Sequence, residues 1–258
     1  MNVKSYAEST AFIIGGSTGI GLATAYRLAE SGVPRIALAG RTAARVRSAA
    51  ETLSTTYGIP AEGFAFDATD LAATRAGVAA AEEFLGGVDI MVSSVTDAAT
   101  PELLVDQPVE GLEGDLRGLL IPPVTLTRLI LPGMYARGGG SIVLVASDAA
   151  KTATPGETVI GAAMAGIVMF ARTVAMEAKR QGVRVNAVTP SLVAGTPTSE
   201  RLIQEGFSAK LFAAATKQAA LGVTVPDDVA ALIAYLAGPD AARLTGQAIS
   251  VNGGISAA

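Results

Sequence analysis

Residues 11–21, AFIIGGSTGIG, join a short apolar run directly to a glycine-rich turn and the start of a helical pattern. The run AFIIG (11–15) is typical of a strand that is buried on both faces. Glycines at Gly15, Gly19 and Gly21 permit a tight turn, a close approach of the backbone to a diphosphate, and close packing of the helix on the strand. The pattern alone also fits an ordinary turn, but its place at the first strand–helix junction favours a nucleotide site on the helix N-terminus.

The same alternation of apolar runs and amphipathic stretches continues along the chain. It predicts further strands at 35–40, 63–67, 88–94, 141–147, 183–189 and 247–252. It predicts helices at 20–31, 42–57, 71–85, 101–119, 123–137, 157–180 and 227–237, with shorter helical pieces between 190 and 220. We therefore expect an α/β fold, with 1–258 forming one Rossmann-type doubly wound domain. Its seven-stranded, mostly parallel sheet would carry helices on both faces.

Composition excludes several classes of protein. The 258 residues contain no cysteine and no histidine, which removes disulfides, thiol nucleophiles, the usual zinc ligands and the commonest general base, and we expect no metal site. A net charge of −4 argues against a nucleic-acid partner. The most apolar stretch, 159–176, is interrupted by Arg172 and is interpreted as a core helix rather than a membrane span. No signal peptide is apparent, so we expect a cytoplasmic protein with no membrane partner.

Polar residues directly after the next two strands bear on the choice of nucleotide. An acid after the second strand would hold a ribose 2′-hydroxyl, whereas Arg41 suits a 2′-phosphate. Arg41 could equally be an exposed arginine at a helix start. Asp67 could accept a hydrogen bond from an adenine amino group, or cap the next helix, or do both.

Several motifs occur in an order and spacing that this chain shares with a known protein family. They are GGSTGIG (15–21), Asp67, VDIMV (88–92), GGGSIVLVAS (138–147), GVRVNAVTP (182–190) and LTGQAISVNGG (244–254). Together they resemble the short-chain dehydrogenase/reductase family over essentially the whole length. The resemblance implies a Rossmann-type fold, a nicotinamide cofactor and a homo-oligomer, often a tetramer, otherwise a dimer. Arg41 resembles the branch that prefers NADP(H), so NADP(H) is the expected cofactor.

The resemblance also assigns cofactor contacts. It places the cofactor on Gly15, Ser17, Thr18, Gly19, Ile20, Gly21, Arg41, Asp67, Ala68, Ser93, Ser94, Met164, Pro190 and Thr196. The family's conserved segment after the fourth strand falls on Ser93 to Thr96, which has a different sequence here. The threonine that would hold the carboxamide is shifted by one position, to Thr196.

The family's catalytic positions are only partly filled. In the family, a serine polarises the substrate carbonyl and falls here on Ser147. The tyrosine that moves the proton falls on Ile160, and the lysine four residues later falls on Met164. The asparagine that positions a water falls on Asp115. In the enoyl-reductase branch the tyrosine lies seven residues before the lysine, a position that Glu157 occupies.

Four acids are expected to face the same cleft and, with Ser147, are the catalytic candidates: Asp97, Asp115, Asp148 and Glu157. An apolar pair in the tyrosine and lysine positions would raise the pKa of nearby carboxylic acids, and a neutral carboxylic acid can act as a general acid. Each of the four could instead be a capping residue or a solvated surface residue.

Residues 191–221 lie where the family has a substrate lid, and their mixture of Phe, Leu and Ala would line a largely apolar pocket. We expect this pocket to contain Leu192, Phe207 and Phe212 from the lid, with Ile160 below them.

These observations leave three functions open. The favoured one is an NADP(H)-dependent oxidoreductase with a non-standard proton source, acting on a small, largely apolar carbonyl, iminium or activated-alkene substrate. The second is a cyclase, dehydratase or isomerase that reuses the pocket without redox chemistry. The third is a catalytically silent NADP(H)-binding protein.

Overall fold

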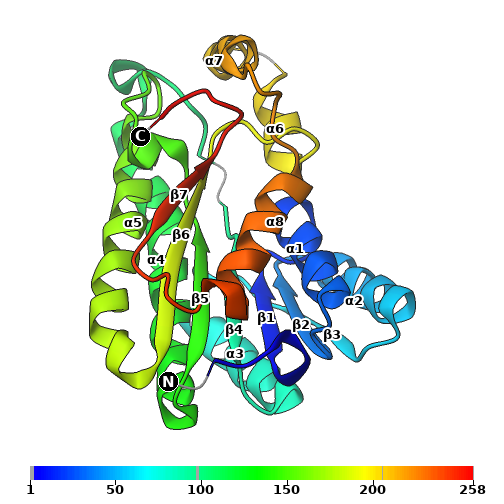
Figure 1. Ribbon diagram of the computed structural model, residues 1–258. Coiled ribbons are helices and arrows are strands. Elements are labelled where there is room, and N and C mark those ends of the chain that lie inside the picture. Colours follow the sequence, from blue (N-terminus) through cyan, green and yellow to red (C-terminus); the bar gives the residue numbers. More distant parts are fainter. Residues whose placement is uncertain (1–2, 97–98, 205, 258) are drawn as a thin grey trace.

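A sheet of seven strands forms the centre of the protein, in the order β3-β2-β1-β4-β5-β6-β7 (Figure 1). The structure, a computed structural model, describes residues 3–96, 99–204 and 206–257. All the strand pairings within these residues are parallel. The strands are β1 (Thr10–Ile14), β2 (Arg35–Gly40), β3 (Ala61–Ala65), β4 (Ile90–Ser93), β5 (Gly140–Val145), β6 (Val183–Pro190) and β7 (Ala248–Val251).

Helices cover both faces of the sheet, which confirms the Rossmann-type doubly wound fold. They are α1 (Gly19–Glu30), α2 (Ala43–Tyr57), α3 (Leu71–Leu85), α4 (Val109–Arg137), α5 (Thr158–Ala178), α6 (Pro197–Leu202), α7 (Gly206–Gln218) and α8 (Pro226–Ala237). Helices α3, α4 and α5 pack on one face, and α1, α2 and α8 pack on the other. Helices α6 and α7 stand above the carboxyl ends of the strands (Figure 1).

The first strand shows why the sequence folds this way. Its residues alternate between the two cores: Phe12 and Ile14 pack among the residues of α3, α4 and α5, whereas Ala11 and Ile13 pack with those of α1, α2 and α8. A strand with helices on both faces must be apolar at every position, which is what AFIIG provides.

Helix α4 differs from the expectation. The sequence predicted two helices, at 101–119 and 123–137, but the structure has one helix, Val109–Arg137, that continues through Pro122 and Pro123. Each proline removes one backbone hydrogen bond of the helix. Both prolines are buried, and their packing outweighs the local preference to end the helix.

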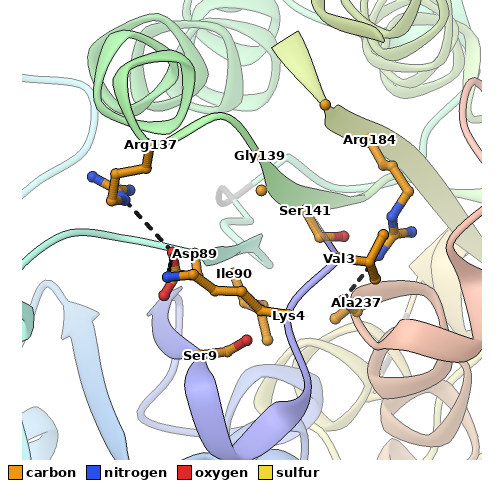
Figure 2. Close-up of a pocket in the computed structure, with 12 residues that line it drawn as sticks. Val3, Lys4, Ser9, Asp89, Ile90, Arg137, Gly139, Ser141, Arg184 and Ala237 are labelled. Carbon is orange, nitrogen blue, oxygen red and sulfur yellow. Dashed lines mark hydrogen bonds and ion pairs between the residues drawn. The ribbon is translucent and has the colours of Figure 1, made fainter. Parts of the chain in front are cut away.

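At the amino ends of the central strands, opposite the glycine loop, charged side chains hold neighbouring elements together (Figure 2). Asp89, just before β4, accepts a hydrogen bond from Lys4 Nζ at 2.8 Å and one from the Thr10 backbone N–H at 3.1 Å. The Arg137 Nε lies 3.5 Å from the same carboxylate. The N-terminal segment, β1 and the end of α4 are therefore joined at one acid.

Arg184 of β6 performs a similar role for α8 (Figure 2). It is only 6% exposed, and its guanidinium donates hydrogen bonds to the backbone carbonyls of Leu236, Ala237 and Gly238. A cation at a helix C-terminus satisfies the last carbonyls and interacts favourably with the helix dipole. The hollow between these charges has a volume of about 40 Å³, enough for water but not for an organic substrate.

Two described helical stretches, Val109–Arg137 and Thr158–Gln181, are long and apolar enough to cross a membrane by length and composition. Here they pack against each other and against the sheet, and Ile130 and Ile167 belong to the same buried core. This packing accounts for their apolar character and agrees with the interpretation of 159–176 as a core helix.

Candidate functional site

A cavity of about 570 Å³ opens at the carboxyl ends of the strands. It is lined by the glycine loop, by residues that follow β2, β3, β4, β5 and β6, and by α6 and α7. From the expected sites it brings together Gly15, Ser17, Thr18, Gly19, Ile20, Arg41, Asp67, Ala68, Ser94, Ser147, Met164, Pro190, Leu192, Thr196 and Phe212. Doubly wound sheets hold their ligands at this edge.

The glycine loop has no room for side chains. Gly15 has φ +81° and Gly19 has φ +52°, values that favour glycine. A Cβ on Gly15 would lie 2.6 Å from the Ser94 carbonyl oxygen, and one on Gly21 would lie 2.2 Å from the Gly15 carbonyl oxygen. Gly21 therefore does not face the cavity but lets α1 approach the loop, so that the N-terminus of α1 points into the cavity.

The β2–β3 end of the cavity carries two arginines and one acid. Arg41 follows β2 directly, and Arg45 lies one turn into α2 on the same wall. The sequence placed a strand over 63–67, but β3 ends at Ala65, so Asp67 lies beyond the strand on the cavity wall. Hydrogen bonds from the Thr69 N–H and hydroxyl, at 2.9 and 2.8 Å, lower the pKa of Asp67 and keep it ionised.

The opposite end of the cavity contains Ser147 and Met164. The Ser147 hydroxyl oxygen accepts a hydrogen bond from the Ala149 N–H at 3.2 Å, so its own proton is available to donate elsewhere. Met164 is 8% exposed and forms part of the wall. Ile160, one turn earlier on α5, is partly buried against the core and is not part of the wall.

The structure separates the four candidate acids. Asp148 is buried, and its two carboxylate oxygens accept hydrogen bonds from Ser250 at 3.2 Å and Ser256 at 2.5 Å. Its side chain therefore joins the β5–α5 loop to the C-terminal segment. Asp115 lies partly exposed on α4, outside the described cavity wall. Asp97 lies outside the described residues.

Glu157 is the acid with the most unusual environment. It is the N-cap residue of α5, one turn before Ile160 and two turns before Met164, on the same side of the helix. Burial raises the pKa of its carboxyl above the ordinary value of 4.5, a hydrogen bond with Thr154 lowers it, and the negative charge of Asp148 raises it. The net direction is upward, so folding favours the neutral form of this carboxyl. Glu157 is not among the residues that line the described wall of the cavity.

This shift predicts a pH dependence of stability. Because folding raises the pKa of Glu157, the folded protein keeps a proton that the unfolded chain has lost, and the free energy of unfolding falls as pH rises from about 4.5 through the folded pKa. Urea unfolding at several pH values should show that the Glu157→Gln variant gains stability relative to the original protein as pH rises across this window. A stability difference that does not change with pH would contradict the shift.

The segment 191–221, where the sequence predicted a lid, contributes several described residues to the cavity wall, and these include Leu192, Thr196 and Phe212. Thr196 caps α6, because its hydroxyl oxygen accepts a hydrogen bond from the Ser199 N–H at 3.1 Å. Phe207, expected in the pocket, packs instead against Gly156 of the β5–α5 loop, where a Cβ would lie 2.1 Å from the ring. This contact seats the start of α7 on the loop that precedes α5.

Comparison with known proteins agrees with this architecture. A family profile described as enoyl-(acyl carrier protein) reductase matches residues 15–256. A short-chain reductase from Streptomyces niveus is 33% identical, with 96% of this chain and 94% of the relative covered. The chain belongs to the short-chain dehydrogenase/reductase family. A 7alpha-hydroxysteroid dehydrogenase from Bacteroides fragilis is 31% identical, with 98% of this chain and 96% of the relative covered.

Solved structures of the short-chain dehydrogenase/reductase family superpose over almost the whole chain. An L-sorbose reductase from Gluconobacter frateurii, complexed with NADPH and L-sorbose, has a TM-score of 0.86 at 29% identity and covers 99% of this chain and 98% of its own. An actinorhodin polyketide ketoreductase with NADPH has a TM-score of 0.87 at 29% identity and covers 98% of this chain and 99% of its own.

The sequence did not indicate two of the arginines that line the cavity of this protein, Arg45 and Arg201. Arg45 could have been found from its place in the first turn of the predicted helix at 42–57, directly after the second strand, because residues there face the carboxyl ends of the strands. Arg201 lies in the lid segment, and its Nη1 donates a hydrogen bond to Thr100 Oγ1 at 3.2 Å. Nothing in the sequence pairs residue 201 with residue 100. Ser93, assigned to the cofactor by the resemblance, is 2% exposed at the end of β4 and is not among the residues that line the described wall of the cavity.

Proposed function

We propose that this protein is an NADP(H)-dependent reductase of activated alkenes with an altered active site. The observation that carries the proposal is Glu157, a carboxyl with a raised pKa at the start of the helix that carries Ile160 and Met164. These two apolar residues occupy the positions of the family's tyrosine and lysine. A neutral carboxylic acid beside them replaces the missing proton source. The description of the matching family profile, enoyl-(acyl carrier protein) reductase, supports the same reaction class.

The shape of the glycine loop supports the cofactor. Glycines at Gly15 and Gly21 let the loop pack closely on Ser94 and on the start of α1, because a Cβ there would lie 2.6 Å from the Ser94 carbonyl oxygen and 2.2 Å from the Gly15 carbonyl oxygen. This packing turns the N-terminus of α1 towards the cavity, where a diphosphate would bind. We propose that Gly19 and Ile20 at the start of α1 hold the diphosphate, and that Arg41 holds the 2′-phosphate with Arg45 beside it. Asp67 would receive the adenine amino group. NADPH bound in this way would supply the hydride for the reduction.

The chain's own residues then polarise and protonate the substrate. We propose that Ser147 donates a hydrogen bond to the carbonyl oxygen conjugated to the alkene, which draws electron density from the β-carbon. We propose that Glu157 supplies the proton that the α-carbon takes up when the alkene is reduced. Since Glu157 is not among the residues that line the described wall, we propose that the proton passes through water. The resulting carboxylate recovers its proton from solvent, which balances the reaction.

The lid segment and the outer helices suggest how the site is enclosed and assembled. We propose that residues 191–221 act as the lid of a single domain and close over a small, largely apolar substrate. Ile121, Met169 and Met176 leave an apolar exposed face on α4 and α5, which supports assembly as a homo-oligomer. We place this assembly in the cytoplasm, without membrane or nucleic-acid partners.

A matched pair of ketones tests the reaction class. Purified protein should oxidise NADPH in the presence of cyclohexenone and form cyclohexanone, identified by mass spectrometry, and should not oxidise NADPH with cyclohexanone itself. Reduction of cyclohexanone alone would show a carbonyl reductase instead. NADPH binding with no oxidation by cyclohexenone, cinnamaldehyde or pyrroline would favour the silent binding protein, whereas absence of NADPH binding would leave only the cofactor-free functions.

The Arg41→Gln variant should bind NADPH about tenfold more weakly, because a charge-assisted hydrogen bond to the 2′-phosphate is lost. Its affinity for NADH should change by less than about twofold, since NADH lacks that phosphate. Fluorescence titration with both cofactors measures this. An equal loss for NADPH and NADH would show that Arg41 supports the loop rather than the phosphate.

A further inference from the structure

Ser147, whose hydroxyl must point at the substrate in the proposed reaction, lies between two anchored residues. On its N-terminal side, the Ala146 N–H donates a hydrogen bond to the Val188 carbonyl of β6 at 2.9 Å. On its C-terminal side, Ser147 is the N-cap residue of a short 3₁₀ turn, Asp148–Ala150. Ser147 lines the cavity, whereas Asp148 is not among the residues of the described wall. Whatever holds this turn therefore helps to fix the direction of the Ser147 hydroxyl.

The turn is held by residues from the C-terminal part of the chain. Asp148 is 5% exposed, and its carboxylate accepts hydrogen bonds from Ser250 of β7 at 3.2 Å and from Ser256 at 2.5 Å. Lys151, directly after the turn, donates a hydrogen bond to the same Ser250 hydroxyl at 2.6 Å. A buried carboxylate is unfavourable unless it is hydrogen-bonded, so these donors favour one position of Asp148 strongly.

The chain after β7 is folded so that Ser256 reaches this carboxylate. Gly253 and Gly254 have φ +65° and +86°, values that favour glycine, and they turn the chain back. The Asn252 side chain, which is 7% exposed, closes the turn. Its Oδ1 accepts a hydrogen bond from the Gly254 N–H at 3.1 Å, and its Nδ2 donates to the Ser256 carbonyl at 3.2 Å and to the Ser256 hydroxyl oxygen at 3.0 Å. The sequence NGG thus builds the turn that presents the Ser256 hydroxyl.

We propose that Asp148, held by the segment 250–256, positions Ser147 in the active site. The inference deepens the proposed function, because it rests on Ser147 as the group that polarises the substrate carbonyl. Asp148 then serves as a positioning residue rather than as a general acid, since both of its oxygens accept hydrogen bonds from this segment. A displacement of about 1 Å can slow an enzyme about a hundredfold even when its cause lies away from the reacting atoms. The segment 250–256 can therefore support the reaction without touching the substrate.

The Ser256→Ala variant tests this inference. It removes the hydroxyl that bonds to Asp148, while Asn252 can still donate to the backbone carbonyl of residue 256 and keep the turn. The kcat for cyclohexenone should fall about tenfold, as expected when a hydrogen bond to a charged group is lost, and NADPH affinity should stay within about twofold. The conservative Ser256→Thr variant keeps the hydroxyl and should retain kcat to within about twofold.

Hydrogen exchange gives a second measurement that does not depend on catalysis. The Ala149 N–H donates a hydrogen bond to the Ser147 hydroxyl oxygen at 3.2 Å, and the Ala150 N–H donates one to the Ser147 carbonyl at 3.0 Å. Looser support of the turn exposes both amides to solvent more often. Exchange over residues 147–152, followed by mass spectrometry, should be about tenfold faster in Ser256→Ala and close to the original in Ser256→Thr.

The control is Ser48→Ala, which removes an exposed hydroxyl of α2 and should leave both kcat and exchange unchanged. Unchanged exchange over residues 147–152 in Ser256→Ala overturns the inference, as does a kcat within about twofold of the original. So does an NADPH affinity that falls as much as kcat, because the variant would then disturb the whole site. If the original protein does not reduce cyclohexenone, the proposed function fails, while the exchange measurement still decides whether the segment 250–256 holds Ser147.

Discussion

The Glu157→Gln variant should reduce cyclohexenone about a hundredfold or more slowly than the original protein, because general acid catalysis typically contributes about 10²–10⁴ in rate. The amide has nearly the same shape but cannot deliver the proton. The rate of the original protein should fall as pH rises through the raised pKa of Glu157, since the neutral acid is the active form. This alkaline fall should be absent in the variant.

The control for this prediction is Glu177→Gln, which removes an exposed acid five turns further along α5 and should leave rate and pH profile unchanged. NADPH affinity, measured by fluorescence, should stay within about twofold in both variants, because neither residue lies on the described wall of the cavity. A Glu157→Gln variant that keeps more than about a third of the rate would remove Glu157 as the proton source.

The Gly21→Ala variant should lose NADPH affinity by about a hundredfold, or roughly 3 kcal/mol. The added carbon would lie 2.2 Å from the Gly15 carbonyl oxygen. Gly15 cannot retreat easily, because its N–H donates a hydrogen bond to the Ala39 carbonyl at 2.9 Å. The N-terminus of α1 must therefore move away from the loop, and the diphosphate loses its N–H donors. Fluorescence titration, with circular dichroism to verify folding, measures the effect.

Two further alanine variants complete this experiment. A Cβ on Gly114 of α4 meets no atom within 4 Å, so Gly114→Ala should bind NADPH normally and stabilise the helix by up to about 1 kcal/mol. Gly19→Ala places its carbon 3.3 Å from Thr196 and should fold while binding NADPH about tenfold more weakly. Normal NADPH affinity in Gly21→Ala would refute the role of the loop.

The parts of the structure that could be predicted from sequence are those set by local pattern. The alternation of apolar runs and amphipathic stretches predicted the parallel sheet and the order of strands and helices along the chain. The turn at Gly15 and Gly19 predicted the end of the sheet at which the cavity opens. The continuation of α4 through Pro122 and Pro123 could not be predicted, because local preference opposes it and burial against the sheet decides it.

The contacts that distinguish the candidate acids from one another could not be predicted from the sequence either, because they join residues far apart in the chain. Asp148 is occupied by Ser250 and Ser256, about a hundred positions later. The raised pKa of Glu157 depends on how deeply the turn before α5 is buried. The side chain of Arg201 reaches Thr100 only because α6 folds back over the strands. Spacing along the sequence named Asp148 and Glu157 as candidates but did not indicate Arg201. Tertiary packing determined the environment of all three residues.

The position of β1 in the middle of the sheet also has consequences during synthesis on the ribosome. One edge of β1 pairs with β2, which follows soon after it, but the other edge pairs with Ile90–Ser93, almost eighty residues later. Until β4 has been made, the most apolar strand of the core keeps an unpaired edge. Such an edge can pair with another chain, so aggregation competes with folding in this interval. The nascent protein is therefore open to such pairing before its first hundred residues have emerged, and a chaperone that covers that early edge would raise the yield of folded protein.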